Sequence, residues 1–188
     1  MAEMKEHRKY YFTVEGECEH WYLKWLQNQI NAEPSSRYQV TLDCPKQKDP
    51  VKYVKNLIVT RKTDITHVFD YESDEDVHTT QFQTTLDRMK EAQSLGKEIK
   101  YHIGYSNFTF ELWMILHKAD CNGSFTHRRQ YITPINNAYD ENFEDLDQYK
   151  HEANFKRVLG KLTLVDVKRA IERAKIIMQR NNEPYNLQ

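Results

Sequence analysis

Acidic side chains gather at two places where an apolar run of the sequence meets a helical pattern. Glu15 and Glu17 follow an aromatic and β-branched run near the start of the chain, and Asp70 and Glu72 lie in "VFDYES". Carboxylates this close repel one another unless a cation lies among them. Such hard oxygen ligands suit Mg²⁺ or Mn²⁺, which bind one or two carboxylates together with water and substrate phosphate. The acids therefore predict a divalent-metal site.

A third polar group follows the apolar run that ends at Tyr105, where Asn107 precedes Glu111 by four residues. In open α/β sheets, functional residues gather at the carboxyl ends of the strands, so this pair is a candidate for the same site. Asn107 is equally suited to cap a helix. Glu111 lies among apolar neighbours, which predicts a partly buried face, and a buried carboxylate needs a partner. The acids near residue 15 could likewise only cap a helix.

Four strand-like runs alternate with helical spacing along the first two thirds of the chain. The runs are Tyr10 to Val14, Tyr38 to Cys44, Ile65 to Tyr71 and Ile99 to Tyr105. Strands that alternate with helices predict an α/β fold with a mostly parallel sheet and helices on both faces. From Asp120 onward no strand pattern occurs, and a long helical pattern runs from Val165 to Arg180. We expect an α/β core over residues 1–119 and a helical extension over 120–188.

The composition restricts the compartment and the partners of the chain. The 188 residues carry a net charge of −1, so any binding of nucleic acid must rely on a local basic patch. The candidates for phosphate contacts are Arg128, Arg129 and Lys168, although a solvated helix face explains Lys168 equally well. The three cysteines form no C-x-x-C pair and no signal peptide precedes them, which favours the cytoplasm. No apolar run approaches the roughly 20 residues of a membrane span.

Three segments resemble the motifs of the RloB-like proteins, which are accessory products of restriction and phage-defence loci. The segments are "VEGECEHWYLKWL", "VFDYES" and "SNFTFELWMILH", and the resemblance covers Tyr10 to His117. These proteins are related to the Toprim catalytic domain of topoisomerases, primases and OLD-type nucleases. The resemblance implies a compact Toprim-like, Rossmann-like α/β domain that holds Mg²⁺ with one glutamate and an acidic pair.

The resemblance transfers roles to individual residues. The Toprim glutamate corresponds to Glu15, the acidic pair to Asp70 and Glu72, and the characteristic Asn and Glu to Asn107 and Glu111.

The chain departs from the family pattern at three positions. Cys18 stands where threonine is frequent, Glu72 replaces an aspartate, and Phe108 replaces the proline of Ser-Asn-Pro. We expect the longer Glu72 side chain to reach a metal still, and we expect the loss of proline to alter only the entry into the helix.

These observations predict a nuclease that depends on Mg²⁺ or Mn²⁺, hydrolyses DNA or RNA, and acts in phage defence or abortive infection. Asp70, Glu72 and Glu15 would hold the metal and Glu17 could join them, while Glu15 is also a candidate general base. One alternative is a non-catalytic Toprim-like module that assembles with an ATPase or a restriction-locus protein. Nucleotidyl transfer, as in primases, is a further alternative. The sequence leaves the substrate type and the oligomeric state open, including a homodimer.

Overall fold

The computed structural model describes residues 5–71, 76–121, 123 and 125–181. These residues form two compact units. Unit 1 holds the described residues of 5–69 and 76–105, and unit 2 holds those of 70–71 and 106–181. Each unit is described by itself below. The sequence predicts a boundary between an α/β core and a helical extension after residue 119, and this boundary remains a prediction.

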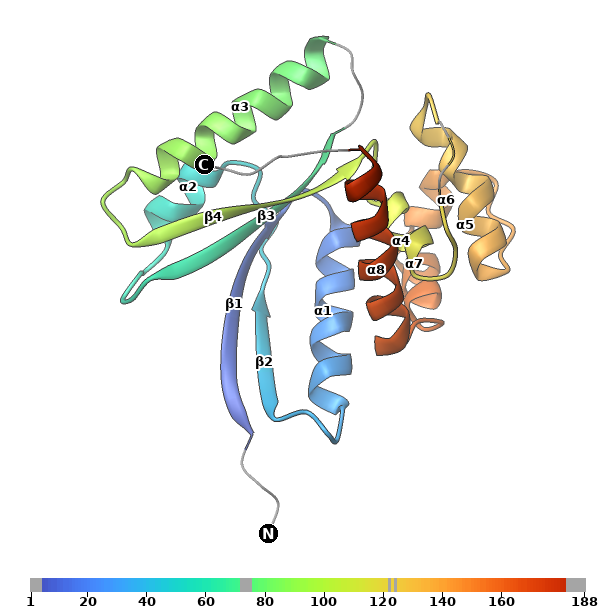
Figure 1. Cartoon of the computed structure of the whole chain (residues 1–188), viewed down its shortest axis with the longest axis horizontal. Coiled ribbons are helices and arrows are strands. Elements are labelled where there is room, and N and C mark those ends of the chain that lie inside the picture. The colour runs from blue at the N-terminus through green and yellow to red at the C-terminus, as the bar shows by residue number, and fades with distance from the viewer. Residues whose placement is uncertain (1–4, 72–75, 122, 124, 182–188) are drawn as a thin grey trace. The chain divides into compact units, whose positions relative to one another are not determined.

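Unit 1 is built on a four-stranded sheet of order β2-β1-β3-β4 (Figure 1). The strands are β1 (Glu6–Val14), β2 (Tyr38–Asp43), β3 (Thr63–Tyr71) and β4 (Ile99–Asn107). β1 pairs in parallel with both neighbours, with Glu6 opposite Tyr38 and Tyr11 opposite Ile65. The predicted α/β fold with a mostly parallel sheet is confirmed.

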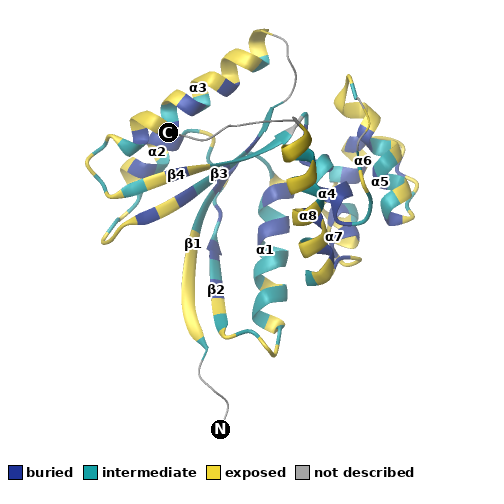
Figure 2. Ribbon diagram, viewed as in Figure 1, coloured by how far each residue is buried: buried dark blue, intermediate teal, exposed yellow. Residues whose placement is uncertain are grey.

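β1 begins four residues before the predicted start at Tyr10. Residues Glu6 to Tyr10 are exposed, as Figure 2 shows for the first half of this strand. Their side chains carry no apolar pattern, and backbone pairing with β2, together with contacts such as the ion pair of Lys9 with Asp43, makes the segment a strand. Only the second half, which ends at the buried Thr13 and Val14, contributes to the core.

Three helices accompany the sheet in unit 1. They are α1 (Glu17–Ala32), α2 (Pro50–Asn56) and α3 (Asp76–Gln93). α1 is fastened to β2 by Lys24, whose Nζ donates to the Leu42 carbonyl at 2.8 Å. α2 starts at Pro50 because the Asp49 carboxylate accepts hydrogen bonds from the first backbone N–H groups of the helix. The same carboxylate pairs with Arg88 at 2.7 Å, which joins α2 to α3.

The core of unit 1 contains a buried polar pair. Thr13 of β1 and His67 of β3 lie opposite each other in register and share a hydrogen bond of 2.6 Å between Oγ1 and Nδ1. Phe69 stacks on the imidazole with ring centroids 5.1 Å apart. Burial lowers the pKa of His67 to about 4, because a charged imidazolium is poorly solvated there. His67 is therefore neutral at pH 7.

Unit 2 is helical beyond the ends of β3 and β4. Its elements are α4 (Glu111–Leu116), the 3-10 turn η1 (Arg128–Tyr131), α5 (Ile132–Tyr139), α6 (Leu146–Lys150), α7 (Glu152–Leu159) and α8 (Leu164–Asn181). The predicted helical extension is confirmed for its described residues. The core contains Met114, Ile135, Tyr149 and Phe155, all fully buried.

Polar contacts fix α4 within unit 2. The Tyr139 hydroxyl donates to the Met114 carbonyl at 2.6 Å, and Lys118 pairs with the buried Asp166 of α8 at 3.0 Å. His117 is fully buried after α4, with Nδ1 2.9 Å from the Trp113 carbonyl, and burial lowers its pKa to about 4. None of the described helices has the length and hydropathy required to cross a membrane.

Candidate functional site

Asp70 lies at the carboxyl end of β3. A residue with an unusual backbone conformation holds the backbone of unit 2 there. The N–H of Phe108, just past β4, donates to the carbonyl of Tyr71 at 2.6 Å. Phe108 has a φ of 65°, in the left-handed region. This conformation costs a non-glycine residue about 1–2 kcal/mol. Such conformations persist only where the surrounding structure enforces them, and they concentrate at functional sites.

Phe108 corrects one expectation from the sequence. The replacement of the family's proline was expected to alter only the entry into the helix. Proline fixes φ near −65° and has no N–H, so it could neither adopt the observed conformation nor donate to Tyr71. The substitution therefore changes the backbone of the junction itself.

Glu111, the first residue of α4, is fully buried. Its Oε2 accepts a short hydrogen bond from the Thr109 hydroxyl, and its Oε1 lies 3.2 Å from Nζ of Lys150 on α6. Oε1 receives no aligned hydrogen bond, so the contact with Lys150 is mainly one between charges. Burying a carboxylate is expensive unless a cation or donors compensate it. The apolar neighbours of Glu111 in the sequence predicted both its burial and its need for a partner.

Tyr131 relates Glu111 to Asp70. This tyrosine ends η1 and is buried. Burial raises the pKa of its hydroxyl most, and the charges of Glu111 and Asp70 raise it further. The charges of both carboxylates therefore raise the pKa of one group, the neutral hydroxyl of Tyr131. Tyr131 was not predicted from the sequence, where nothing distinguishes it from the chain's other tyrosines.

The carboxylates of unit 2 fit the chemistry of Mg²⁺ or Mn²⁺. These ions take one or two protein carboxylates, and Asp70 and Glu111 supply two, one of them with an oxygen free of aligned donors. No three His, Cys, Asp or Glu side chains among the described residues are grouped to hold a metal. Glu72 and the side chain of Asn107 lie outside the described part of the chain. Lys150 already neutralises Glu111 and would compete with a metal for it.

The first acidic motif belongs to unit 1. Glu15 is half-buried between β1 and α1, and Glu17 is exposed and forms an ion pair with Lys46. Glu17 would have to leave this pair to bind a metal. A side chain at Gly16 would place its Cβ 2.7 Å from Oε2 of Glu19, so the glycine makes room for that carboxylate. The first turn of α1 carries Glu17 and Glu19, whose charges favour its N-terminus, but no side chain caps this end by a hydrogen bond.

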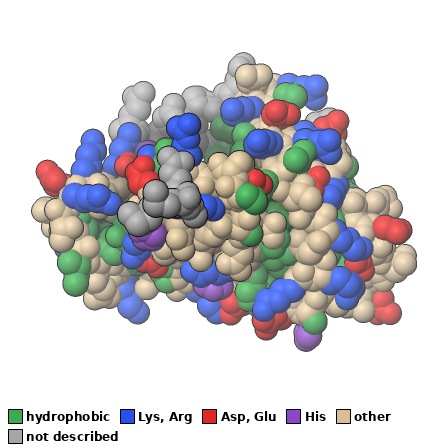
Figure 3. All heavy atoms as spheres, turned by 90° about the horizontal axis from the view of Figure 1, so that it is seen from below, with side chains coloured by type: hydrophobic (Ala, Val, Ile, Leu, Met, Phe, Trp, Pro, Cys, Tyr) green, Lys and Arg blue, Asp and Glu red, His purple; other side chains and the backbone are tan. Residues whose placement is uncertain are grey.

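The predicted phosphate contacts all lie in unit 2. Arg128 and Arg129 are exposed in η1, and Lys168 is exposed on α8. Figure 3 shows lysine and arginine side chains interspersed with acidic ones on the face in view. On that face, contacts with a polyanion would therefore be made by individual cations.

Comparison with known proteins identifies the family. The family model described as RloB-like protein matches residues 10–187. No curated protein matches the chain. The motif resemblance ends at His117, whereas the family match continues through the helices of unit 2. Since this match spans nearly the whole chain, the protein belongs to the RloB-like family.

Proposed function

We propose that the protein is a nuclease that hydrolyses phosphodiester bonds of DNA or RNA with Mg²⁺ or Mn²⁺. One observation supports this most: Asp70, at the end of β3, and the buried Glu111, just past the neighbouring strand β4, both belong to unit 2. Carboxylates at the carboxyl end of a sheet are suitably placed for such chemistry. The proposed setting, phage defence or abortive infection, follows from the resemblance to RloB-like proteins.

Asp70 and Glu111 would hold the ion, and Glu72 would join from the same strand end. The resemblance implies Glu15 as a further ligand or as the general base, and Glu17 as an additional ligand. A bound divalent ion supplies a water of lowered pKa and neutralises charge on the scissile phosphate.

The remaining side chains of the site have separate tasks. The positive charge of Lys150 would compensate the negative charge of Glu111 until a substrate or a metal binds. Arg128, Arg129 and Lys168 would contact phosphates of the bound strand.

Cleavage of a mixed panel tests the proposal. Plasmid, single-stranded DNA, total RNA and tRNA are incubated with wild type and Mg²⁺ or Mn²⁺, beside Asp70→Asn and Glu15→Gln. We expect cleavage of one substrate class, abolished by EDTA and reduced about 100-fold or more by Asp70→Asn, since it removes charge that faces the transition state. Asp147→Asn is a matched control, because Asp147 is an exposed acid of α6. Equal cleavage by the Asp70 and Asp147 variants would contradict the proposed site.

A second candidate function is favoured by α8. Four large apolar side chains of this helix are exposed, namely Val165, Ile171, Ile176 and Met178. Exposed apolar residues in number are typical of surfaces that bind another protein. The chain could then be a non-catalytic module that assembles with an ATPase, a restriction-locus protein or a second copy of itself. This function replaces the first if wild type cuts nothing and calorimetry detects no binding of Mn²⁺.

A further inference from the structure

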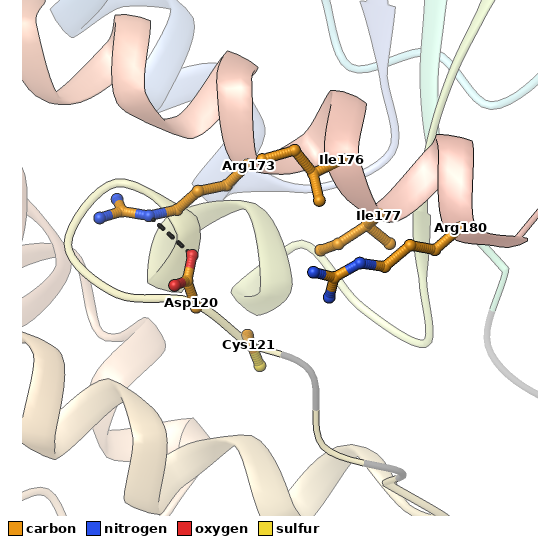
Figure 4. A pocket seen from close by; sticks show the side chains of 6 residues that line it. All are labelled: Asp120, Cys121, Arg173, Ile176, Ile177 and Arg180. Atoms are coloured by element: carbon orange, nitrogen blue, oxygen red, sulfur yellow. Dashed lines mark hydrogen bonds and ion pairs between the residues drawn. The ribbon is translucent and has the colours of Figure 1, made fainter.

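A small hollow in unit 2 combines two arginines with an apolar wall. It is lined by Asp120, Cys121, Arg173, Ile176, Ile177 and Arg180 (Figure 4). Its volume is about 80 Å³. A water molecule occupies about 30 Å³ in the liquid, so the hollow has room for a group of a few heavy atoms.

The two arginines of the hollow differ in how far their charge is compensated. Arg173 donates from Nε to the Asp120 carboxylate at 3.1 Å and from Nη1 to the Leu116 carbonyl at 2.7 Å. Arg180 has no acidic partner among the described residues, and Figure 4 shows its guanidinium extending from α8 toward Cys121. Burial raises the pKa of the Cys121 thiol, which keeps it neutral. Two guanidinium groups and one carboxylate leave the hollow with one net positive charge.

These features favour a phosphate group as the ligand. The guanidinium fork matches the oxygens of a phosphate and can bind two of them at once. The Asp120 side chain is 74% exposed, so solvent weakens its hold on Arg173. Ile176 and Ile177 form an apolar wall beside the charge, where less water means a stronger attraction between a cation and an anion.

The hollow adjoins the acidic pair of the candidate site. Arg173 holds the carbonyl of Leu116, the last residue of α4, whereas Glu111 is the first. The rise between these two residues is about 7.5 Å. The hollow and Glu111 are thus connected by one short helix of unit 2.

We propose that the hollow formed by Arg173 and Arg180 binds a backbone phosphate of the polynucleotide whose scissile phosphate faces Asp70 and Glu111. This assignment rests on the proposed nuclease function. It adds Arg180 to the phosphate contacts proposed above.

Binding without catalysis tests the assignment. Fluorescence anisotropy measures the affinity of full-length protein for labelled single-stranded DNA and RNA oligonucleotides in EDTA, over a range of salt concentrations. We expect Arg180→Gln to weaken binding about tenfold, as the loss of one charge-assisted hydrogen bond implies. The slope of log affinity against log salt should fall by about 0.7. Arg180→Lys should retain part of the affinity. Arg61→Gln, which removes an exposed arginine of unit 1, should bind like wild type.

The outcomes distinguish a failure of the proposed phosphate site from a failure of the proposed nuclease function. If Arg180→Gln binds like wild type while Asp70→Asn abolishes cleavage, the hollow is not a phosphate site and the nuclease proposal stands. If wild type cuts nothing but Arg180→Gln still weakens binding, the hollow stands and the catalytic proposal fails. Competition with inorganic phosphate and with AMP separates the sources: equal affinity for AMP and for the oligonucleotide would overturn a polynucleotide ligand. A lowered melting temperature of Arg180→Gln with unchanged affinity would assign Arg180 to the stability of α8 and overturn the proposal.

Discussion

Glutamates follow a strand at two junctions, the one between β1 and α1 and the one between β4 and α4. The two junctions differ in how far the glutamate and its lysine partner are exposed to solvent. In the first, Glu17 and Lys46 have side chains that are 48% and 50% exposed. In the second, Glu111 is 0% exposed and its partner Lys150 is 35% exposed. Water can replace Lys46 as a partner of Glu17, but it cannot reach Glu111. Glu17 is therefore a solvated residue on the surface of a helix, whereas Glu111 is a buried residue that constrains the fold.

The largest expected difference follows from removing each acid. Glu111→Ala leaves the Thr109 hydroxyl and Lys150 without their partner in a buried place, and we expect a loss of about 3 kcal/mol in the free energy of unfolding. Glu17→Ala removes an exposed ion pair and should cost less than about 1 kcal/mol. Urea denaturation of the two variants at pH 7 measures both values.

A double-mutant cycle checks that the pair itself is responsible. Glu111→Gln keeps the shape of the side chain, and combining it with Lys150→Gln should recover part of the lost stability. Equal losses from the alanine variants at positions 17 and 111 would show that burial does not separate the two junctions.

The backbone of the two junctions should differ as well. Phe108→Pro restores the residue of the family pattern, but proline cannot adopt a φ of 65° or donate to Tyr71, so we expect a loss of about 2–3 kcal/mol. Gly16 has an ordinary extended conformation, with φ −126° and ψ 177°. Gly16→Ala meets only the flexible end of Glu19 and should cost about 1 kcal/mol or less. Thermal melts compare the two variants, and a Phe108→Pro protein as stable as wild type would refute the backbone argument.

The smallest effect concerns the buried histidines, where the two units should behave alike. His67 in unit 1 and His117 in unit 2 both have a pKa of about 4 when folded, against an ordinary value of 6.5. The unfolded chain therefore binds protons first as the pH falls, and each histidine removes about 1 kcal/mol of stability between pH 7 and pH 5.5. Above pH 6.5 this contribution is fully present. His67→Gln and His117→Gln should each lose less stability over that interval than wild type, as urea denaturation at both pH values will show.

The sequence predicted the fold better than the site because the fold depends on local patterns. Alternating runs marked the four strands, and Pro50 marked the start of α2. The ion-pair partner of a charged residue, in contrast, does not depend on local patterns. Lys46 lies 29 residues from Glu17, and Lys150 is separated from Glu111 by several helices, so no spacing rule connects them. Phe108 is likewise left-handed because of its surroundings, since its residue type disfavours that conformation.

The shortness of α4 has a consequence for the order in which the protein matures. This helix has six residues, whereas an isolated helix needs about 12–15 to persist in water. Its carbonyls are held by Tyr139 and by Arg173, and Arg173 follows Leu116 by 57 residues. Ribosomes add about 5–20 residues per second, so roughly 3–11 s pass between the synthesis of these two partners. A nascent chain thus carries Glu111 for seconds before α8 can hold α4, and the acidic site is assembled only after α8 has been made.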